Sequence, residues 1–184
     1  RMRDRLSPYE RYMVEAEYFM KTGDFDRAVD RYRAHIVEAK TFGRNQVMVS
    51  YLSTSLLHIL LGDLEEAERV LQEARTWFRG PFNQTYLTRV LYARGKEAEA
   101  HEVLAETMKE FPGNAWPRTA QAHFSASKGD YAAAHALALR IDAPPELRFS
   151  LRTAALFDAI RGRFAEATAH LRELTTALRE AGLN

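Results

Sequence analysis

The sequence predicts an all-α chain built from five consecutive helical hairpins, on three observations. A glycine recurs at intervals of 39, 33, 34 and 33 residues, an alanine follows each of these glycines five positions later, and a small residue precedes each by seven positions. Repetition at this period is typical of stacked helical repeats. The glycines are Gly23, Gly62, Gly95, Gly129 and Gly162; the alanines are Ala28, Ala67, Ala100, Ala134 and Ala167; the small residues are Ala16, Ser55, Thr88, Ala122 and Ala155.

Each predicted hairpin has a simple physical basis. Glycine ends the first helix because it adopts the left-handed conformation at little steric cost. An aspartate that follows it, as in Gly62-Asp63, caps the second helix by accepting backbone N–H bonds. The small residues on both helices then allow the two helices to approach closely. Apolar residues keep a helical period and alternating segments are missing, so no strand is expected.

The helices are expected to follow one another along a single domain over 8–184, after a basic linker over 1–7. The first helix begins with the capping box Ser7-Pro8-Tyr9-Glu10, which has proline at the first helical position. The first repeat is the longest, so its second helix should extend through 39–41, with a turn at 43–45. The expected repeats are about 8–43, 46–80, 82–113, 116–145 and 146–181, and the expected helices are 8–21, 25–41, 46–61, 64–78, 83–94, 97–110, 116–128, 131–140, 146–161 and 164–181.

The period, the small residues on both helices and the Gly-Asp-aromatic turn at Gly23-Asp24-Phe25 resemble the tetratricopeptide repeat (TPR) family. The aromatic residue that this family carries eleven positions before the glycine is present as Tyr12 and Tyr51, but Gln84 replaces it in the third repeat. The resemblance implies a TPR-type right-handed α–α superhelix. It also implies that the first helix of each repeat, helix A, lines a concave groove that binds a protein or peptide partner.

The opening segment is also similar to repeats in the C-terminal sensor regions of bacterial protein kinases and transcription regulators. The similar residues are 6–18 and the run Gly-Asp-Phe-Asp-Arg-Ala-Val over 23–29. This similarity, and a first residue that is Arg1, lead us to expect a fragment of a larger signalling or regulatory protein. The alternative to partner binding is therefore self-association, for example as a homodimer, or regulatory packing on another domain of the same chain.

Composition disfavours several other classes of function. The formal net charge is +1, so no long-range field attracts nucleic acid, and no apolar run is long enough to cross a membrane. Absence of cysteine excludes thiolate chemistry and fits a reducing compartment such as the cytoplasm. His101 and His135 occupy equivalent repeat positions, which favours a structural role, and no histidines pair at i,i+4 spacing. We therefore expect no catalytic residues, no cofactor and no metal.

The candidate site is the helix-A groove. Its residues are apolar and aromatic, with Arg89, His123 and Arg152 as hydrogen-bond donors, so they predict a partner with apolar anchors and an acidic group, either an amphipathic helix or an extended peptide. Aliphatic residues of the second repeat can instead simply pack between helices. Only Arg89 fits the pattern by which one TPR subclass holds chaperone C-termini, so that mode is not expected. The groove residues are Met13, Glu17, Leu52, Ser53, Leu56, Thr85, Tyr86, Arg89, Tyr92, Trp116, His123 and Arg152.

Overall fold

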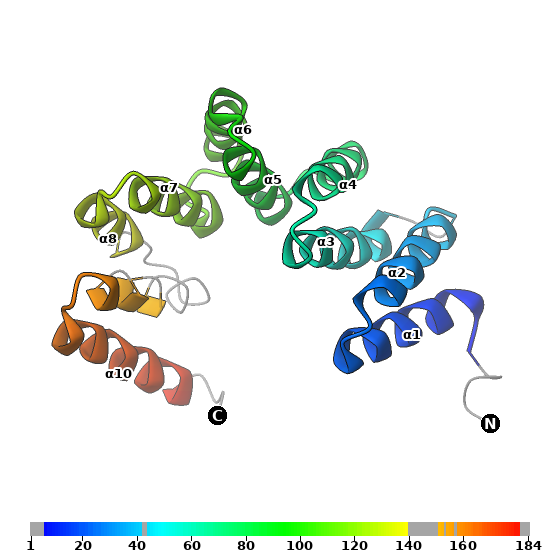
Figure 1. Cartoon of the computed structure of the whole chain (residues 1–184), viewed down its shortest axis with the longest axis horizontal. Helices are drawn as coiled ribbons and strands as arrows, with labels where there is room; N and C mark the ends of the chain where they lie inside the picture. The colour runs from blue at the N-terminus through cyan, green and yellow to red at the C-terminus, as the bar shows by residue number, and fades with distance from the viewer. Residues whose placement is uncertain (1–5, 42–43, 140–150, 153, 157, 181–184) are drawn as a thin grey trace. The chain divides into compact units, whose positions relative to one another are not determined.

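The computed structural model describes residues 6–41, 44–139, 151–152, 154–156 and 158–180, and every regular element among them is a helix (Figure 1). The chain divides into two compact units, residues 1–103 and 104–184. Residues 151–152, 154–156 and 158–160 are also helical. The helices are α1 (Pro8–Thr22), α2 (Phe25–Ala39), α3 (Arg44–Leu60), α4 (Leu64–Trp77), α5 (Pro81–Ala93), α6 (Glu97–Glu110), α7 (Ala115–Ser127), α8 (Tyr131–Leu139) and α10 (Phe164–Glu180).

The predicted glycine turns are confirmed. All five repeat glycines have φ between 75° and 80°, in the left-handed region where side chains other than glycine are strained. At Gly23 the backbone N–H donates to the Met20 carbonyl at 3.3 Å and closes α1. Asp24, Asp63 and Asp130 then cap the next helices, each accepting a backbone N–H three residues later. The hairpins are therefore set by short-range chemistry.

The small residues lie where the hairpin argument places them. Ala28, Ala67, Ala100 and Ala134 are fully buried, and Ala167 is 6% exposed. Their partners on the preceding helices are buried as well, among them Ala16, Ser55, Thr88, Ala122 and Ala155. In the first unit Ala16 and Ala28 belong to an apolar cluster with Tyr32 and Leu57, and a second cluster is centred on Tyr51 and Val70. From α1 to α5 the core of the first unit is thus a series of contacts between successive helices.

Some predicted boundaries are wrong by a few residues. The turn expected at 43–45 is not a turn at its last two positions, because α3 already begins at Arg44. Helix α2 ends at Ala39 instead of residue 41, and α5 begins at Pro81 instead of residue 83. Proline suits the first helical position because it has no N–H to leave unpaired, and Gly80 precedes it as the N-cap.

The first part of the helix predicted at 146–161 lies outside the described residues. From 151 onward the described residues are helical up to 160, as predicted. The assignment of 8–184 to one domain stays a prediction, and each compact unit is considered by itself below.

Candidate binding surfaces

Helices α1 and α3 hold the first group of predicted groove residues, and packing occupies part of each. Met13 is half-buried against the cluster that contains Ala16 and Tyr32. Glu17 is exposed, and its Oε1 accepts a hydrogen bond of 2.6 Å from the Tyr32 hydroxyl. Burial first, and then this bond to Glu17, raises the pKa of Tyr32 to about 12. The Tyr32 hydroxyl therefore keeps its proton at neutral pH and holds the Glu17 carboxylate in place.

The α3 members of the set keep part of their surface. Leu52, Ser53 and Leu56 are all half-buried. Val49, one turn before Ser53 on the same helix, is 45% exposed. A partner lying on α3 would therefore meet aliphatic side chains whose burial is incomplete in the free chain, and covering them would contribute favourable free energy.

Helix α5 carries the most distinctive arrangement. The rings of Phe82 and Tyr86 have centroids 4.8 Å apart, and the guanidinium carbon of Arg89 lies 5.6 Å from the centre of the Tyr86 ring. All three side chains are half-buried and follow one another on one side of the helix. Phe82, Tyr86 and Arg89 are called the α5 stripe. Tyr92 is half-buried one turn further on, whereas Thr85 is fully buried and offers a partner no surface.

Electrostatics add to the character of the α5 stripe. Burial lowers the pKa of Arg89, because water that would stabilise the guanidinium is partly excluded. The face of the Tyr86 ring supplies a compensating negative quadrupole. The stripe thus combines the flat surfaces of two aromatic rings with a partly desolvated cation.

The second unit holds the remaining predicted groove residues. Trp116, in the first turn of α7, is half-buried, and His123 is exposed two turns later. Arg152 is exposed on the helical segment that follows residue 150. These three side chains belong to a different compact unit from the α5 stripe.

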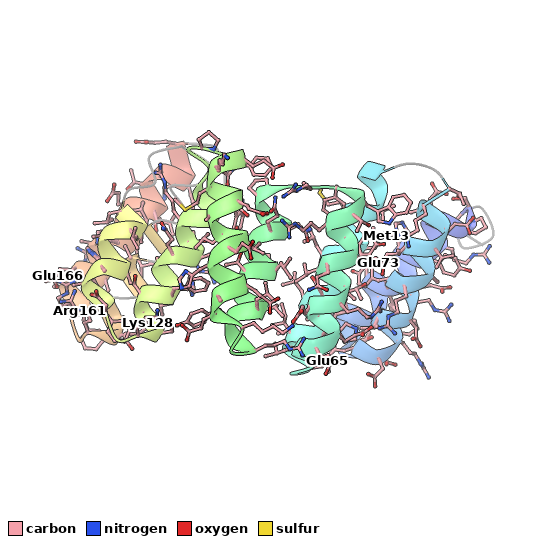
Figure 2. All side chains as sticks on the ribbon, turned by 90° about the horizontal axis from the view of Figure 1, so that it is seen from above. Met13, Glu65, Glu73, Lys128, Arg161 and Glu166 are labelled. Atoms are coloured by element: carbon pink, nitrogen blue, oxygen red, sulfur yellow. The ribbon has the colours of Figure 1, made fainter. Side chains whose placement is uncertain are left out.

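A recess of about 200 Å³ lies against α2, α3 and α4, and sequence reasoning missed it. Glu73 of α4, labelled in Figure 2, lines this recess and accepts hydrogen bonds of 2.7 Å from both the Lys40 ammonium and the Tyr51 hydroxyl. Burial opposes ionisation of Glu73, but these bonds outweigh it and lower the pKa of the carboxyl. The recess is lined by Arg33, Ile36, Val37, Lys40, Tyr51, Thr54, Arg69, Val70 and Glu73.

Carboxylates already neutralise much of the positive charge in this recess. Glu66 accepts hydrogen bonds from Arg33 and from Arg69, and the bonds from Arg69 hold the pKa of Glu66 at about 2. Lys40 is engaged by Glu73. We therefore interpret the recess as the site of a group of ion pairs that join α2 to α4, and not as an anion-binding site. Its charged residues stand on second helices, where a sequence offers no sign that they will meet.

Sequence reasoning also missed a group of side chains with metal-ligand chemistry in the second unit. His135 of α8 and His170 of α10 approach Asp158 from different helical segments. A search for histidines spaced within one helix cannot find such a group. The available signal was the repeat register: His135 follows its glycine by six positions, as Glu68 does, and Glu68 also contacts the next hairpin.

Comparison with known proteins defines the class of fold. No protein-family model and no curated protein matches the chain. Several solved structures do match. One is BtubC from P. vanneervenii, which is 17% identical with a TM-score of 0.61, and the match covers 94% of this chain and 80% of that one. The TPR-like repeats of a putative kinesin light chain from Podosopora anserina match at 16% identity and a TM-score of 0.56, with coverages of 96% and 99%.

A third solved structure is YrrB, described as a TPR protein with an unusual peptide-binding site. It matches at 15% identity and a TM-score of 0.51, over 94% of this chain and 91% of that one. The fold is therefore the all-α TPR fold that the repeat pattern predicts. At these identities the similarity concerns the fold and carries no ligand with it. Separately, none of the helices described here has the length and apolar character needed to cross a lipid bilayer.

Proposed function

We propose that this chain is a non-enzymatic binding module that captures a protein or peptide through its helix-A residues, as part of a larger signalling or regulatory protein. The observation that carries the proposal is the α5 stripe, where Phe82, Tyr86 and Arg89 form a continuous aromatic and cationic surface. Tyr and Arg are among the residues that dominate binding energy at protein interfaces. A TPR fold with a peptide-binding site in YrrB supports the same reading by analogy.

The stripe also specifies the chemistry of the partner. Tyr86 and Phe82 favour a flat apolar or aromatic anchor, and Arg89 favours a carboxylate next to it. The exposed Val49 and half-buried Leu56 on α3 would accept further aliphatic side chains. The preferred ligand is therefore a peptide segment with apolar anchors and an acidic residue, bound as an amphipathic helix or an extended strand.

Selection from a peptide display library tests this proposal, followed by fluorescence anisotropy with the peptides recovered. We expect acidic residues beside aromatic or aliphatic anchors to be enriched. Arg89→Glu and Tyr86→Ala should each weaken binding by about 2 kcal/mol, roughly 30-fold, as truncation of hot-spot residues does. Circular dichroism should show unchanged helicity in both variants.

The matched control is Arg172→Glu, the same charge change at an exposed position on α10. It should leave affinity within about two-fold, because Arg172 is not one of the predicted groove residues and an exposed charge is well screened by salt. Equal affinity of Arg89→Glu, Tyr86→Ala and the unchanged chain would contradict the assignment of the α5 stripe.

Self-association is the second candidate, and exposed apolar side chains favour it. Val14 and Tyr18 of α1 are 55% and 62% exposed. A second copy of the chain could cover them. Sedimentation over a wide concentration range separates the two functions: a concentration-dependent dimer that Tyr18→Glu abolishes supports self-association, whereas a monomer at all concentrations excludes it.

A further inference from the structure

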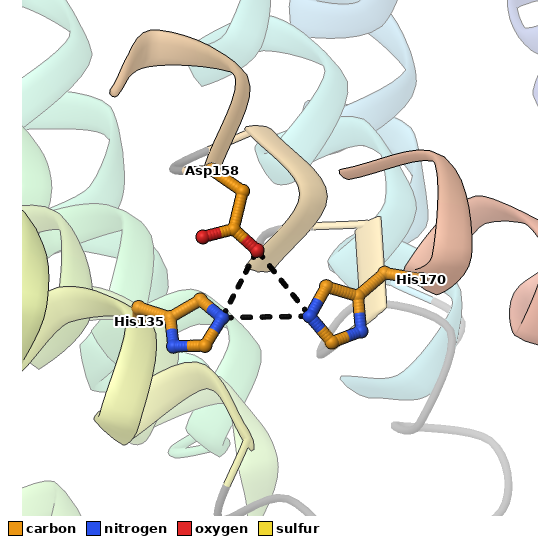
Figure 3. A group of neighbouring side chains, drawn as sticks. All are labelled: His135, Asp158 and His170. Carbon is orange, nitrogen blue, oxygen red and sulfur yellow. Dashed lines mark hydrogen bonds and ion pairs between the residues drawn. The ribbon is translucent and has the colours of Figure 1, made fainter. Parts of the chain in front are cut away.

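Three side chains of the second unit converge from three helical segments (Figure 3). His135 lies on α8, Asp158 on the helical residues 158–160, and His170 on α10. The Nε2 atoms of the two imidazoles are 3.4 Å apart. Oδ2 of Asp158 lies 3.1 Å from Nε2 of His135 and 3.4 Å from Nε2 of His170. Two imidazole nitrogens and one carboxylate oxygen therefore form a nearly equilateral triangle.

The size of this triangle is the size that tetrahedral coordination requires. Nitrogen and oxygen ligands at about 2.05 Å from Zn²⁺ stand about 3.3 Å apart when the geometry is tetrahedral. Octahedral coordination at the same bond length would bring neighbouring ligands to about 2.9 Å. The three separations of 3.1, 3.4 and 3.4 Å match the tetrahedral value more closely. An ion about 0.7 Å from the plane of the triangle would contact all three atoms at ordinary bond lengths.

Asp158 supplies a second, independent observation. Its side chain is only 1% exposed, and among the residues that the structure describes its buried Oδ2 atom has no hydrogen-bond partner of ordinary geometry. Burying such an oxygen is unfavourable unless a donor or a cation satisfies it. The other oxygen, Oδ1, accepts a hydrogen bond of 2.5 Å from Arg163. Arg163 thus orients the carboxylate and leaves Oδ2 directed to the two histidines, as outer-sphere partners of metal ligands do.

Hydrogen bonds between the three side chains explain their arrangement less completely than a bound metal ion does. One imidazole hydrogen can bridge the two Nε2 atoms, yet Oδ2 of Asp158 then still lacks a donor of ordinary geometry. Protonation of both rings would place two positive charges 3.4 Å apart, next to the guanidinium of Arg163. A single divalent ion satisfies all three atoms at once. Arg163 opposes such an ion by its charge, so we expect moderate affinity, below that of a site with a second carboxylate.

We propose that His135, Asp158 and His170 form a binding site for a divalent transition-metal ion, with Zn²⁺ the preferred ion. Imidazole nitrogens favour zinc and its neighbours over Mg²⁺ or Ca²⁺, which take oxygen ligands. Three protein ligands leave the fourth tetrahedral position for water or for a group from a partner. Because the ligands come from α8, the 158–160 segment and α10, the ion would bind the fourth hairpin to the fifth.

Titration of the untagged 184-residue chain with Co²⁺ and Zn²⁺ tests the proposal. We expect one Co²⁺ ion per chain with the intense visible absorption of a tetrahedral site, displaced by Zn²⁺ and not by Mg²⁺. Nitrogen-detected NMR of the histidine rings should show Zn²⁺ shifting the Nε2 resonances of two histidines. Absence of saturable one-to-one binding overturns the proposal, and so does an Nε2–H signal that Zn²⁺ leaves unchanged.

Variants locate the ion. His135→Gln and His170→Gln should each weaken Zn²⁺ binding by at least about 100-fold, since even the outer-sphere partners of metal ligands account for 10–100-fold. His101→Gln is the matched control, because His101 occupies the equivalent position of the preceding repeat and is exposed. It should bind as the unchanged chain does. Equal loss in His101→Gln and His135→Gln would overturn the assignment; the NMR measurement on the unchanged chain decides the matter if a variant does not fold.

Discussion

At the scale of single residues, buried polar side chains join neighbouring hairpins. Glu68 of α4 shows this: its carboxylate is 6% exposed and accepts hydrogen bonds of 2.5 Å from Arg94 and 2.7 Å from Lys96. Burial works against the charge of Glu68, but the bonds from Lys96 and Arg94 outweigh it and lower the pKa of the carboxyl. Both cations belong to the end of the next helix and the turn after it. One acidic side chain thus links the second hairpin to the third.

Glu68→Gln should therefore reduce the free energy of unfolding by about 2 kcal/mol, the typical value of hydrogen bonds to charged groups. Glu65→Gln is the matched control. The side chain of Glu65 is 86% exposed, and its carboxylate lies as far as 3.9 Å from Arg94. Loss of this weak contact should therefore lower the free energy of unfolding by less than about 0.5 kcal/mol. Urea denaturation of both variants measures the difference. Equal midpoints would show that the buried contact contributes nothing to stability.

Histidine burial gives the first unit a pH dependence. His35 is fully buried with Nδ1 2.7 Å from the Ser50 hydroxyl oxygen, and burial lowers the pKa of its imidazole below 6.5. The unfolded chain therefore binds the proton more readily than the folded chain does. The contribution of His35 to stability is complete above the unfolded pKa near 6.5 and decreases as the pH falls below it.

We accordingly expect a lower thermal midpoint at pH 5.5 than at pH 7.5, measured with EDTA present. His35→Gln removes this titrating group, so the gap between the two midpoints should become smaller. A midpoint that rises on acidification, or a gap that His35→Gln leaves unchanged, would contradict the sign of the effect.

At the scale of helices and hairpins, a repeated pair of small residues controls how closely two helices approach. Ala67 of α4 and Ser55 of α3 are both fully buried within one hairpin. The glycine turn between these helices fixes which residues face each other, since Gly62 has φ of 79° and Asp63 caps the next helix at once. The number of residues between a side chain and the glycine therefore sets its position along the hairpin axis.

Ala67→Leu should destabilise the chain by about 1–3 kcal/mol, because a closely packed interface has no room for the added carbons. Ala98→Leu makes the same change at an exposed position on α6 and should remain within about 0.5 kcal/mol. Calorimetry compares the two. A similar loss in both would mean that helix propensity, and not close packing, governs the effect.

At the scale of the whole molecule, each candidate surface depends on which side chains successive repeats bring together. Tyr86 and Arg89 of the α5 stripe belong to the groove predicted from sequence, because they lie within one turn of the same helix. The predicted groove as a whole is less uniform: Thr85 is fully buried, and Glu17 is held by Tyr32. Period and residue type place a side chain on a helix face, but they do not say how much of it the neighbouring helix covers.

The sequence alone determined the order of the helices, the five glycine turns and the buried small residues, because glycine conformation, capping and small-residue spacing act over a few residues. Tertiary structure decided which polar side chains of different helices meet. Glu68 with Arg94, Glu73 with Lys40, and His135 with Asp158 and His170 each join segments more than ten residues apart. These contacts depend on the rotation and offset of the packed helices. A metal site requires that its ligands be placed to within about an ångström, and a repeat period does not specify positions that finely.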